Sequence, residues 1–479
     1  MNFRSTGKWI FQDIRIWIFS VFIFQLIFIT QPPLEPAHAW RQSLTNMMAR
    51  NFVQENASFF LPEIDIAGEH EGVIASELPV LQYIMSIFYR LFGFSHWIGR
   101  LINLIFSLGG VFCFSESLKI VSRNKQLTFY TGLVLLFSLW FSFARKSMPD
   151  TFSVSMAMMA VYGLTLFLYR DRPWGLLVFG LAAALSMLSK IPAALVLSPA
   201  ILFLFSSKIS VNKKIWMTAV GALALLPVLY WYGYMVPLLV AKYKFELFFP
   251  RSLKQGVEEI WTFRKQAVDK LIFKGFSSYV LSIMSFLGLW IALWKRTKVA
   301  AGIFICVVPV FAFYAIKTGL VWATHSYYMV PLVPFMAISI AYLMVKYRSA
   351  SWLKLFLFIG IVESIAFQWN DYFIRNEKKY MLQLESECNQ FSDRNAKVIC
   401  NGTPNPQLMY FMNRRGWSLD APELTDHSRI DQLMSYKPGW LIIDRHRPNA
   451  DQVWNAWRNY GTPVYTSENI MALKLTSGN

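Results

Sequence analysis

Charged residues are scarce in this sequence. They make up 15% of the 479 residues, while 55% are hydrophobic, and a soluble domain carries roughly a quarter charged residues. The composition therefore excludes an ordinary soluble protein and predicts a polytopic α-helical membrane protein. The net charge of +18 does not indicate nucleic acid, because Lys and Arg stand in short groups between apolar runs rather than in one basic patch. We read these groups as membrane-topology signals.

Cysteine is also scarce, and four cysteines are too few for a disulfide framework in a chain of this length. Cys113 and Cys306 lie inside apolar runs, where packing is the expected role. Cys388 and Cys400 lie in the polar C-terminal part. They can pair if that part faces an oxidising compartment, so their state stays open at this point.

Several functional signatures are missing. We find no internal repeat, no low-complexity tract and no phosphate-binding glycine loop. His38 and His325 have no tightly spaced His, Asp or Glu neighbours, so no metal-ligating residue is assigned. Whether a divalent metal is a cofactor is left undecided.

Long apolar runs dominate what is present. The first, 14–29, follows Arg4 and Lys8 and is long enough with its flanks to cross a bilayer, which needs about 20 apolar residues. Ala37-His38-Ala39 imitates a signal-peptidase site, but the run is too long for a signal peptide and prolines intervene. We therefore expect this helix to be retained. Ten further runs follow, for about eleven spans in all: 97–118, 127–144, 152–169, 174–189, 191–207, 215–237, 276–294, 299–316, 327–345 and 352–369.

The loops between these runs predict the topology. Alternate loops are short and basic, as expected on the cytoplasmic side; they carry Lys119, Arg123, Lys125, Arg170, Arg172, Lys208, Lys213, Lys214, Lys295, Arg296, Lys298, Lys346 and Arg348. The opposite loops are longer and hold most of the acids. We expect a cytoplasmic (inner) membrane protein with its N-terminus inside and its C-terminal part outside.

The first outer loop, about 31–95, contains two segments with helical periodicity. Their apolar residues are Leu44, Met47, Met48 and Phe52, then Leu81, Ile84, Met85, Phe88, Leu91 and Phe92. Such amphipathic helices rest at a membrane interface. A second outer segment, 241–274, mixes aromatic and basic residues and is expected to form a flap over the same surface.

The chain divides into a membrane domain, 1–375, and a small soluble domain, 376–479. In the second part, strands are expected at 396–400, at 440–443, near Val464 and at 471–475, and helices over 406–415, 427–436 and 450–460. This alternation predicts a compact α/β domain.

The outer loops hold groups suited to chemistry at a membrane surface. A carboxylate there can accept a proton from an acceptor while cations stabilise a departing lipid phosphate. The acids are Glu35, Glu77 and Asp150. The cations are Arg41, Arg145, Lys146 and Lys190, with His325 as a further phosphate ligand.

At these residues the sequence resembles the GT-C superfamily of polyprenyl-phosphate-sugar-dependent glycosyltransferases, in the branch of protein O-mannosyltransferases and the bacterial aminoarabinose lipid A transferase. The resemblance covers roughly residues 10–210 in order. It rests on Ala49-Arg50-Asn51-Phe52, Glu77-Leu78-Pro79, Leu91-Phe92-Gly93, Gly99-Arg100-Leu101, Ala144-Arg145-Lys146-Ser147-Met148-Pro149-Asp150 and Leu188-Ser189-Lys190-Ile191-Pro192, followed later by His325-Ser326-Tyr327-Tyr328 before Pro331.

The resemblance implies an inverting enzyme that transfers one sugar from a polyprenyl phosphate to a glycan, lipid or protein acceptor on the outer face. It places a catalytic acid in the first outer loop and other acids at Glu77 and Asp150. The usual adjacent acidic pair is absent here, which leaves Glu35. Where relatives have Glu-Lys-Pro this chain has Glu77-Leu78-Pro79, so Arg41 or Lys190 would replace the lysine. His38, Trp40, Gln42, Tyr327 and Tyr328 are added as further substrate-binding residues.

Each of these residues also has an ordinary structural interpretation. Glu35 can be a solvated loop acid, while Glu77 and Asp150 can cap helices. Arg41 can anchor to lipid headgroups and Lys190 can extend to the interface. Two other functions compete with the enzyme. A transporter or flippase of lipid-linked saccharides would place polar groups at mid-membrane and show repeats, whereas a polymer ligase or polymerase of the O-antigen type would share the sugar donor and the outer location.

Overall fold

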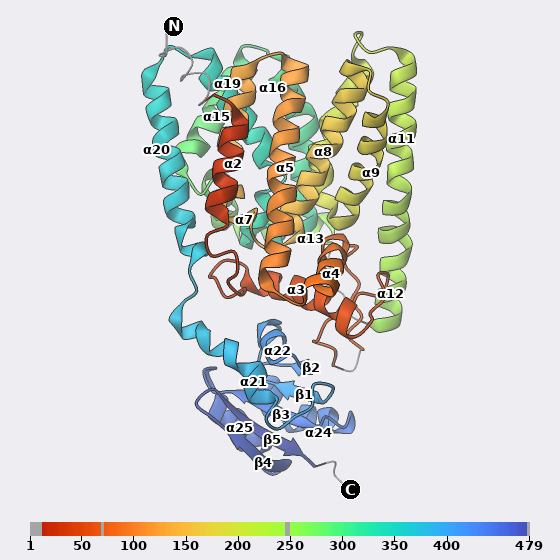
Figure 1. The fold of residues 1–479 in the computed structure, drawn as a ribbon, viewed down its shortest axis with the longest axis vertical. Helices are drawn as coiled ribbons and strands as arrows, with labels where there is room; N and C mark the ends of the chain where they lie inside the picture. Colours follow the sequence, from red (N-terminus) through yellow and green to blue (C-terminus); the bar gives the residue numbers. More distant parts are fainter. Residues whose placement is uncertain (1–11, 69–70, 245–249, 477–479) are drawn as a thin grey trace.

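The computed structural model describes residues 12–68, 71–244 and 250–476. Arg4 and Lys8, used above for topology, lie outside the described residues. The described chain forms a helix bundle with a small α/β domain at one end, and residue 12 lies at the opposite end of the bundle (Figure 1). The α/β part therefore packs against one end of the bundle.

The bundle is built from helices that follow the apolar runs closely. They are α2 (Ile14–Gln25), α5 (His96–Ser122), α6 (Lys125–Leu136), α7 (Trp140–Phe143), α8 (Pro149–Arg170), α9 (Trp174–Ser189), η1 (Ile191–Ala193), α10 (Ala194–Leu197), η2 (Ser198–Phe205), α11 (Val211–Tyr230), η3 (Trp231–Met235), α12 (Val236–Tyr243), α15 (Tyr279–Trp294), α16 (Lys298–Gly302), η5 (Ile303–Val307), α17 (Val308–Thr318), α19 (Val333–Lys346) and α20 (Ser351–Gln368).

Five helical stretches in the described residues are long and apolar enough to cross a membrane, and a bent pair at Arg264–Lys274 and Tyr279–Trp294 makes a sixth. Five shorter apolar helices accompany them. The helical membrane fold is confirmed, whereas the number of about eleven spans stays a prediction.

Outer segments close the end of the bundle that faces the α/β domain (Figure 1). The first outer loop contributes α3 (Ala39–Gln54) and α4 (Val80–Phe92). The second contributes α13 (Leu253–Thr262), α14 (Arg264–Asp269) and η4 (Lys270–Lys274), and α18 (Leu320–Thr324) and η6 (Ser326–Met329) precede α19. Residues 245–249 of the predicted flap lie outside the described residues.

Side-chain caps explain some of these boundaries. Asn124 Oδ1 accepts from the backbone N–H groups of Gln126 and Leu127, both at 3.0 Å, and so begins α6. Glu363, an acid within α20, accepts from Ser278 Oγ at 2.5 Å and from the first backbone N–H groups of α15. A carboxylate inside an apolar helix is therefore satisfied by the start of its neighbour.

The α/β domain contains a five-stranded mixed sheet in the order β2-β1-β3-β5-β4. The strands are β1 (Lys397–Cys400), β2 (Arg415–Ser418), β3 (Trp440–Asp444), β4 (Gly461–Thr466) and β5 (Ile470–Leu475). The helices of this part are η7 (Trp369–Tyr372), η8 (Asn376–Gln383), α21 (Leu384–Cys388), α22 (Gln407–Met412), α23 (Ala421–Thr425), α24 (His427–Ser435) and α25 (Ala450–Trp457). Each predicted strand and helix is found, and β2 is an additional strand. Cys388 and Cys400 are buried free thiols, so they form no disulfide in this structure.

The two outer helices differ in their surroundings. In α4, Leu91 and Phe92 are exposed, as expected of a helix at an interface. In α3, Leu44, Met47 and Phe52 instead share a buried cluster with residues of the α/β domain. The prediction that α3 lays an apolar face on the membrane was wrong, because the α/β domain covers that face.

Candidate functional site

A cavity of about 270 Å³ opens where the first outer loop and the α18–η6 segment meet the bundle. Its walls come from α3, the loop before α4, the break after α9, and the α18–η6 segment. It is lined by Trp40, Arg41, Leu44, Glu77, Lys190, Ile191, Pro192, Tyr232, Thr318, Val321, His325, Tyr327 and Tyr328. Seven of these thirteen residues were predicted as site residues, from positions up to 288 apart in the chain.

Two cation–carboxylate pairs meet at this cavity. Arg41 of α3 pairs with Glu77, and their side chains are 10% and 14% exposed. Lys190 pairs with Asp150 in the first turn of α8, and these side chains are 14% and 4% exposed. Both cations and Glu77 line the cavity. Each cation is therefore held beside an acid yet remains open to a ligand.

Asp150 lies deeper than Glu77. It lines a small void of about 10 Å³ together with Lys190, Tyr314 and Tyr327. One of its carboxylate oxygens accepts from Lys190 Nζ, and the other has no hydrogen-bond partner among the described residues. Its position under Lys190 suits it to hold that ammonium group in place.

Aromatic rings form the opposite wall. The Lys190 ammonium nitrogen lies 4.8 Å from the ring centre of Tyr327 and 5.3 Å from that of Tyr328, distances at which a cation is attracted to a ring face. The imidazole of His325 lies 6.1 Å from the Trp40 ring. These rings give the cavity flat apolar surfaces around its charges.

The backbone at the break after α9 explains how Lys190 reaches the cavity. Helix α9 ends at Ser189, Lys190 has extended backbone angles, and a 3₁₀ turn begins at Ile191. Leu188 O accepts from Leu78 N at 3.0 Å and from the Tyr232 hydroxyl at 3.0 Å. The Ser-Lys-Ile-Pro break is therefore tied directly to the Glu77-Leu78-Pro79 loop.

Glu35 is not brought to the cavity. Both of its carboxylate oxygens accept from Arg100 Nη2, at 2.8 and 2.9 Å, and Gln42 donates to it at 2.7 Å. Each of the two charged side chains is 3% exposed. Burial alone would raise the pKa of Glu35, but the charges of Arg100 and Lys146 and the Gln42 hydrogen bond together lower it. Glu35 thus forms a closed ion pair away from this cavity, and its catalytic role stays a prediction.

Gln42 and Arg145 also lie outside the cavity lining. Gln42 is fully buried and accepts from the Ser147 backbone N–H at 3.3 Å. Arg145 donates to the Phe28 carbonyl at 2.7 Å, and its guanidinium lies 4.5 Å from the ring centre of Tyr372. Gln42 joins the first outer loop to the segment before α8, and Arg145 joins that segment to residues near the ends of α2 and α20, so neither lines the cavity.

His38 packs behind the cavity wall. It shares a hydrogen bond of 3.2 Å with Ser326 Oγ and lies 4.8 Å from the Tyr327 ring centre. Burial, followed by the charge of Lys146, lowers the pKa of His38 to about 2. The imidazole is therefore neutral at physiological pH and joins the first outer loop to η6.

Three buried cations support the site; Lys146 was named among the candidate cations, whereas Arg100 and Lys270 were not. They are Arg100, which pairs with Glu35, Lys146, which pairs with Asp371 at 2.9 Å and donates to the Ala37 carbonyl at 2.9 Å, and Lys270, whose ammonium donates to carbonyls of the α18 segment. Arg100 and Lys146 stood inside motifs of the resemblance, and an ionisable group within an apolar run was the available signal.

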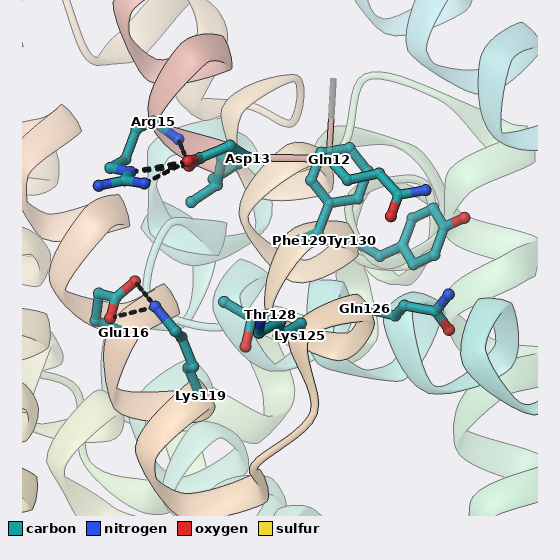
Figure 2. A pocket seen from close by; sticks show the side chains of 11 residues that line it. Gln12, Asp13, Arg15, Glu116, Lys119, Lys125, Gln126, Thr128, Phe129 and Tyr130 are labelled. Atoms are coloured by element: carbon teal, nitrogen blue, oxygen red, sulfur yellow. Dashed lines mark hydrogen bonds and ion pairs between the residues drawn. The ribbon is translucent and has the colours of Figure 1, made fainter. Parts of the chain in front are cut away.

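A larger cavity of about 390 Å³ lies at the other end of the bundle, between α2, α5 and α6. Figure 2 shows its two ion pairs, Asp13 with Arg15 and Glu116 with Lys119, on one side and Phe129 and Tyr130 on the other. It contains none of the predicted site residues, and four of its five charged side chains already form ion pairs with one another.

No group of three or more His, Cys, Asp or Glu side chains in the described ranges is arranged to hold a metal ion. The rings of His38 and His325 are 5.8 Å apart between centres.

The family model described as dolichyl-phosphate-mannose-protein mannosyltransferase matches residues 76–231, a stretch that includes Glu77, Asp150 and Lys190. No curated protein sequence matches the chain at a significant level.

Solved structures resemble the whole chain. ArnT from Cupriavidus metallidurans in the apo state matches with a TM-score of 0.60 and 11% identity over 99% of both chains. The same protein bound to undecaprenyl phosphate gives 0.59 and 11% over 95% of this chain and 97% of that one. The apo oligosaccharyltransferase of Archaeoglobus fulgidus gives 0.58 and 10% over 96% and 74%. These matches confirm the predicted resemblance to the GT-C glycosyltransferase fold.

Proposed function

We propose that this chain is a GT-C glycosyltransferase that transfers a sugar from a polyprenyl-phosphate carrier to an acceptor, and the mannosyltransferase-type match at residues 76–231 supports this. The observation that carries the proposal is the meeting of two cation–carboxylate pairs, Arg41–Glu77 and Lys190–Asp150, at one cavity. A phosphate leaving group needs cations, and an acceptor hydroxyl or amine needs a base.

The cations are suited to bind the carrier phosphate. Arg41 and Lys190 approach the cavity from different elements, so a phosphate between them would receive two charge-assisted contacts. Similar structures bound to undecaprenyl phosphate and to dolichol-phosphate support this ligand class. Asp150 holds Lys190 from below, and the tyrosine faces surround its ammonium group.

Glu77 is the best-placed base. Its carboxylate lines the cavity, while Glu35 is closed by Arg100 and Asp150 lies beneath Lys190. In the proposed step the acceptor heteroatom bonds to the anomeric carbon as the bond from that carbon to the phosphate oxygen breaks. The phosphate keeps the electron pair, the acceptor proton passes to Glu77, and attack opposite the leaving phosphate inverts the anomeric centre.

We place the reaction on the outer face of the cytoplasmic membrane. The basic loops lie at the end of the bundle away from the cavity, and the α/β domain lies at the cavity end (Figure 1). Positive charge favours the cytoplasmic side, so the N-terminus is inside and the C-terminal domain outside. The acceptor is a glycan, lipid or protein reached from that side.

The test is transfer of label from a radiolabelled polyprenyl-phosphate sugar by the purified full chain, with membrane extract as the acceptor source. Transfer by wild type and its loss in Glu77→Gln supports the proposal. No transfer from any carrier sugar, together with movement of labelled lipid between vesicle leaflets, supports a flippase instead. Transfer of a whole saccharide chain supports a ligase or polymerase.

A further inference from the structure

The α18–η6 segment forms one wall of the cavity, yet α18 is only five residues long. A helix this short leaves most of its terminal backbone N–H and C=O groups without partners inside the helix. Gly319 directly precedes it, and the φ of +53° at this residue is a left-handed conformation that favours glycine. Such a segment needs outside contacts to hold one position.

The second outer segment supplies a contact at the start of α18. Glu259 of α13 accepts from the Leu320 backbone N–H at 2.7 Å, and its carboxylate is held by Arg251 at 2.9 Å. A Cβ atom on Gly319 would lie 2.1 Å from Glu259 Oε2. Glycine at 319 is therefore required both by the backbone angle and by the approach of this carboxylate.

The same outer segment supplies a contact at the end of α18. The Lys270 ammonium donates to the carbonyls of Trp322 and His325. Lys270 is 2% exposed, and no ion pair in the part of the chain that the structure describes joins it to a carboxylate. Burying a lysine charge is costly unless its bonds are used, and here they are used on two backbone carbonyls of the cavity wall.

Close packing makes the outer segment a firm support for these contacts. A Cβ atom on Gly256 of α13 would lie 1.8 Å from the Ile316 carbonyl oxygen of α17. Arg251 N donates to the Lys317 carbonyl at 2.8 Å. The segment therefore lies directly against the helix that leads into α18.

We propose that Glu259 and Lys270 are positioning residues that clamp α18 at its two ends and thereby set His325, Tyr327 and Tyr328 against Lys190. This inference rests on the proposed function for its kinetic consequence: the clamp governs binding of the polyprenyl-phosphate sugar rather than the chemical step. Neither residue lines the cavity. Their effect on the cavity is indirect: they hold the segment that carries Tyr327 and Tyr328, and the Lys190 ammonium lies over these two rings.

The first test measures hydrogen exchange of the backbone amides in residues 318–328 of the full detergent-purified chain, without substrate. We expect faster exchange in Lys270→Met and Glu259→Gln than in wild type, and partial restoration in Lys270→Arg, which keeps the charge. Lys265→Met is the matched control, because Lys265 lies on the neighbouring α14 and is exposed. Unchanged exchange in both folded clamp variants would overturn the proposal.

The second test separates positioning from general stability through steady-state kinetics. Loss of a charge-assisted contact is expected to raise the KM for the polyprenyl-phosphate sugar about tenfold, with much smaller changes in kcat and in the acceptor KM. The double variant should show less than the summed effect, because both changes release the same short helix. A fall in kcat alone, or an equal effect from Lys265→Met, would contradict the clamp.

Outcomes for the clamp and for the proposed function remain distinguishable. If Lys270→Met does not fold, Glu259→Gln and Gly319→Ala decide the matter, since the added methyl group displaces the Glu259 carboxylate. If wild type transfers no sugar from any polyprenyl phosphate, the proposed function fails. The exchange measurement still confirms or overturns the clamp in that case.

Discussion

Glu35 and Glu77 belong to the same outer loop, and each is paired with an arginine, yet their surroundings are opposite. The Glu35–Arg100 pair is 3% exposed on both sides and receives a further bond from Gln42. The Glu77–Arg41 pair is 14% and 10% exposed and faces the cavity. The same kind of ion pair is thus closed in one place and accessible from the cavity in the other.

The largest expected effect comes from removing the accessible carboxylate. Glu77→Gln should lower kcat for sugar transfer by roughly 10² to 10⁴, the range of a lost general base. Binding of the sugar donor should persist or tighten, because Arg41 no longer shares its charge with Glu77. Transfer assays and donor binding on the same preparation check this. If Asp150→Asn abolishes transfer while Glu77→Gln does not, the base is Asp150.

Breaking the buried Glu35–Arg100 pair should lower the free energy of unfolding. Arg100→Met leaves the Glu35 carboxylate buried without its cation, a change that costs about 3 to 5 kcal/mol. Arg41→Met should cost less, because the Glu77 carboxylate faces the cavity. Thermal or denaturant unfolding of the two variants in one detergent measures the difference. Equal loss of stability would contradict the distinction between the pairs.

Acid should weaken the closed pair. Because the pKa of Glu35 is lowered in the folded protein, its stabilisation is fully present above the ordinary carboxyl pKa of about 4.3 and is lost as the pH falls through the folded value. The stability gap between wild type and Glu35→Gln should therefore be constant near neutral pH and close in acid. A gap that persists through acid unfolding would argue that Glu35 is already protonated.

The cations of the cavity should affect the sugar donor in a graded way. Arg41→Met and Lys190→Met are each expected to raise the KM for the polyprenyl-phosphate sugar about tenfold, because each loses one charge-assisted contact. Lys254→Met, an exposed residue of α13 outside the cavity lining, is the control. Titrations of the sugar donor at a fixed acceptor concentration measure the effect. An unchanged KM in both cavity variants would show that the carrier phosphate does not bind at Arg41 and Lys190.

The smallest effect is expected for His38. Since burial lowers its pKa to about 2, the imidazole stays neutral between pH 5 and 9, roughly the working range of such enzymes. His38→Gln should leave the shape of the pH profile of kcat/KM unchanged. Disappearance of a limb near pH 6 or 7 in this variant would show that His38 carries a proton in the reaction.

The sequence was a good guide wherever the signal was local. Apolar runs located the bundle helices, and alternation of strand and helix predicted most of the α/β domain. Strand β2 was missed because its four residues, Arg415-Gly416-Trp417-Ser418, carry no strand pattern of their own. It pairs in parallel with β1, and Gly416 also exchanges backbone hydrogen bonds with the first outer loop.

The sequence did not predict which residues far apart in the chain contact one another. Arg41, Glu77 and Lys190 were predicted as site residues and line one cavity, because short motifs marked each of them. Nothing near Glu35 in the sequence indicates that it forms a buried ion pair with Arg100. Nothing near α3 indicates that the α/β domain covers its apolar face. Burial of these groups depends on contacts between separate elements, which no local pattern specifies.

The most direct test of the account is an experimental structure of the full chain with polyprenyl phosphate bound. The account predicts phosphate density between the Arg41 guanidinium and the Lys190 ammonium, with at least one of the carboxylate partners Glu77 and Asp150 displaced and the Glu35–Arg100 pair unchanged. Phosphate density elsewhere, with both cavity pairs intact, would contradict it.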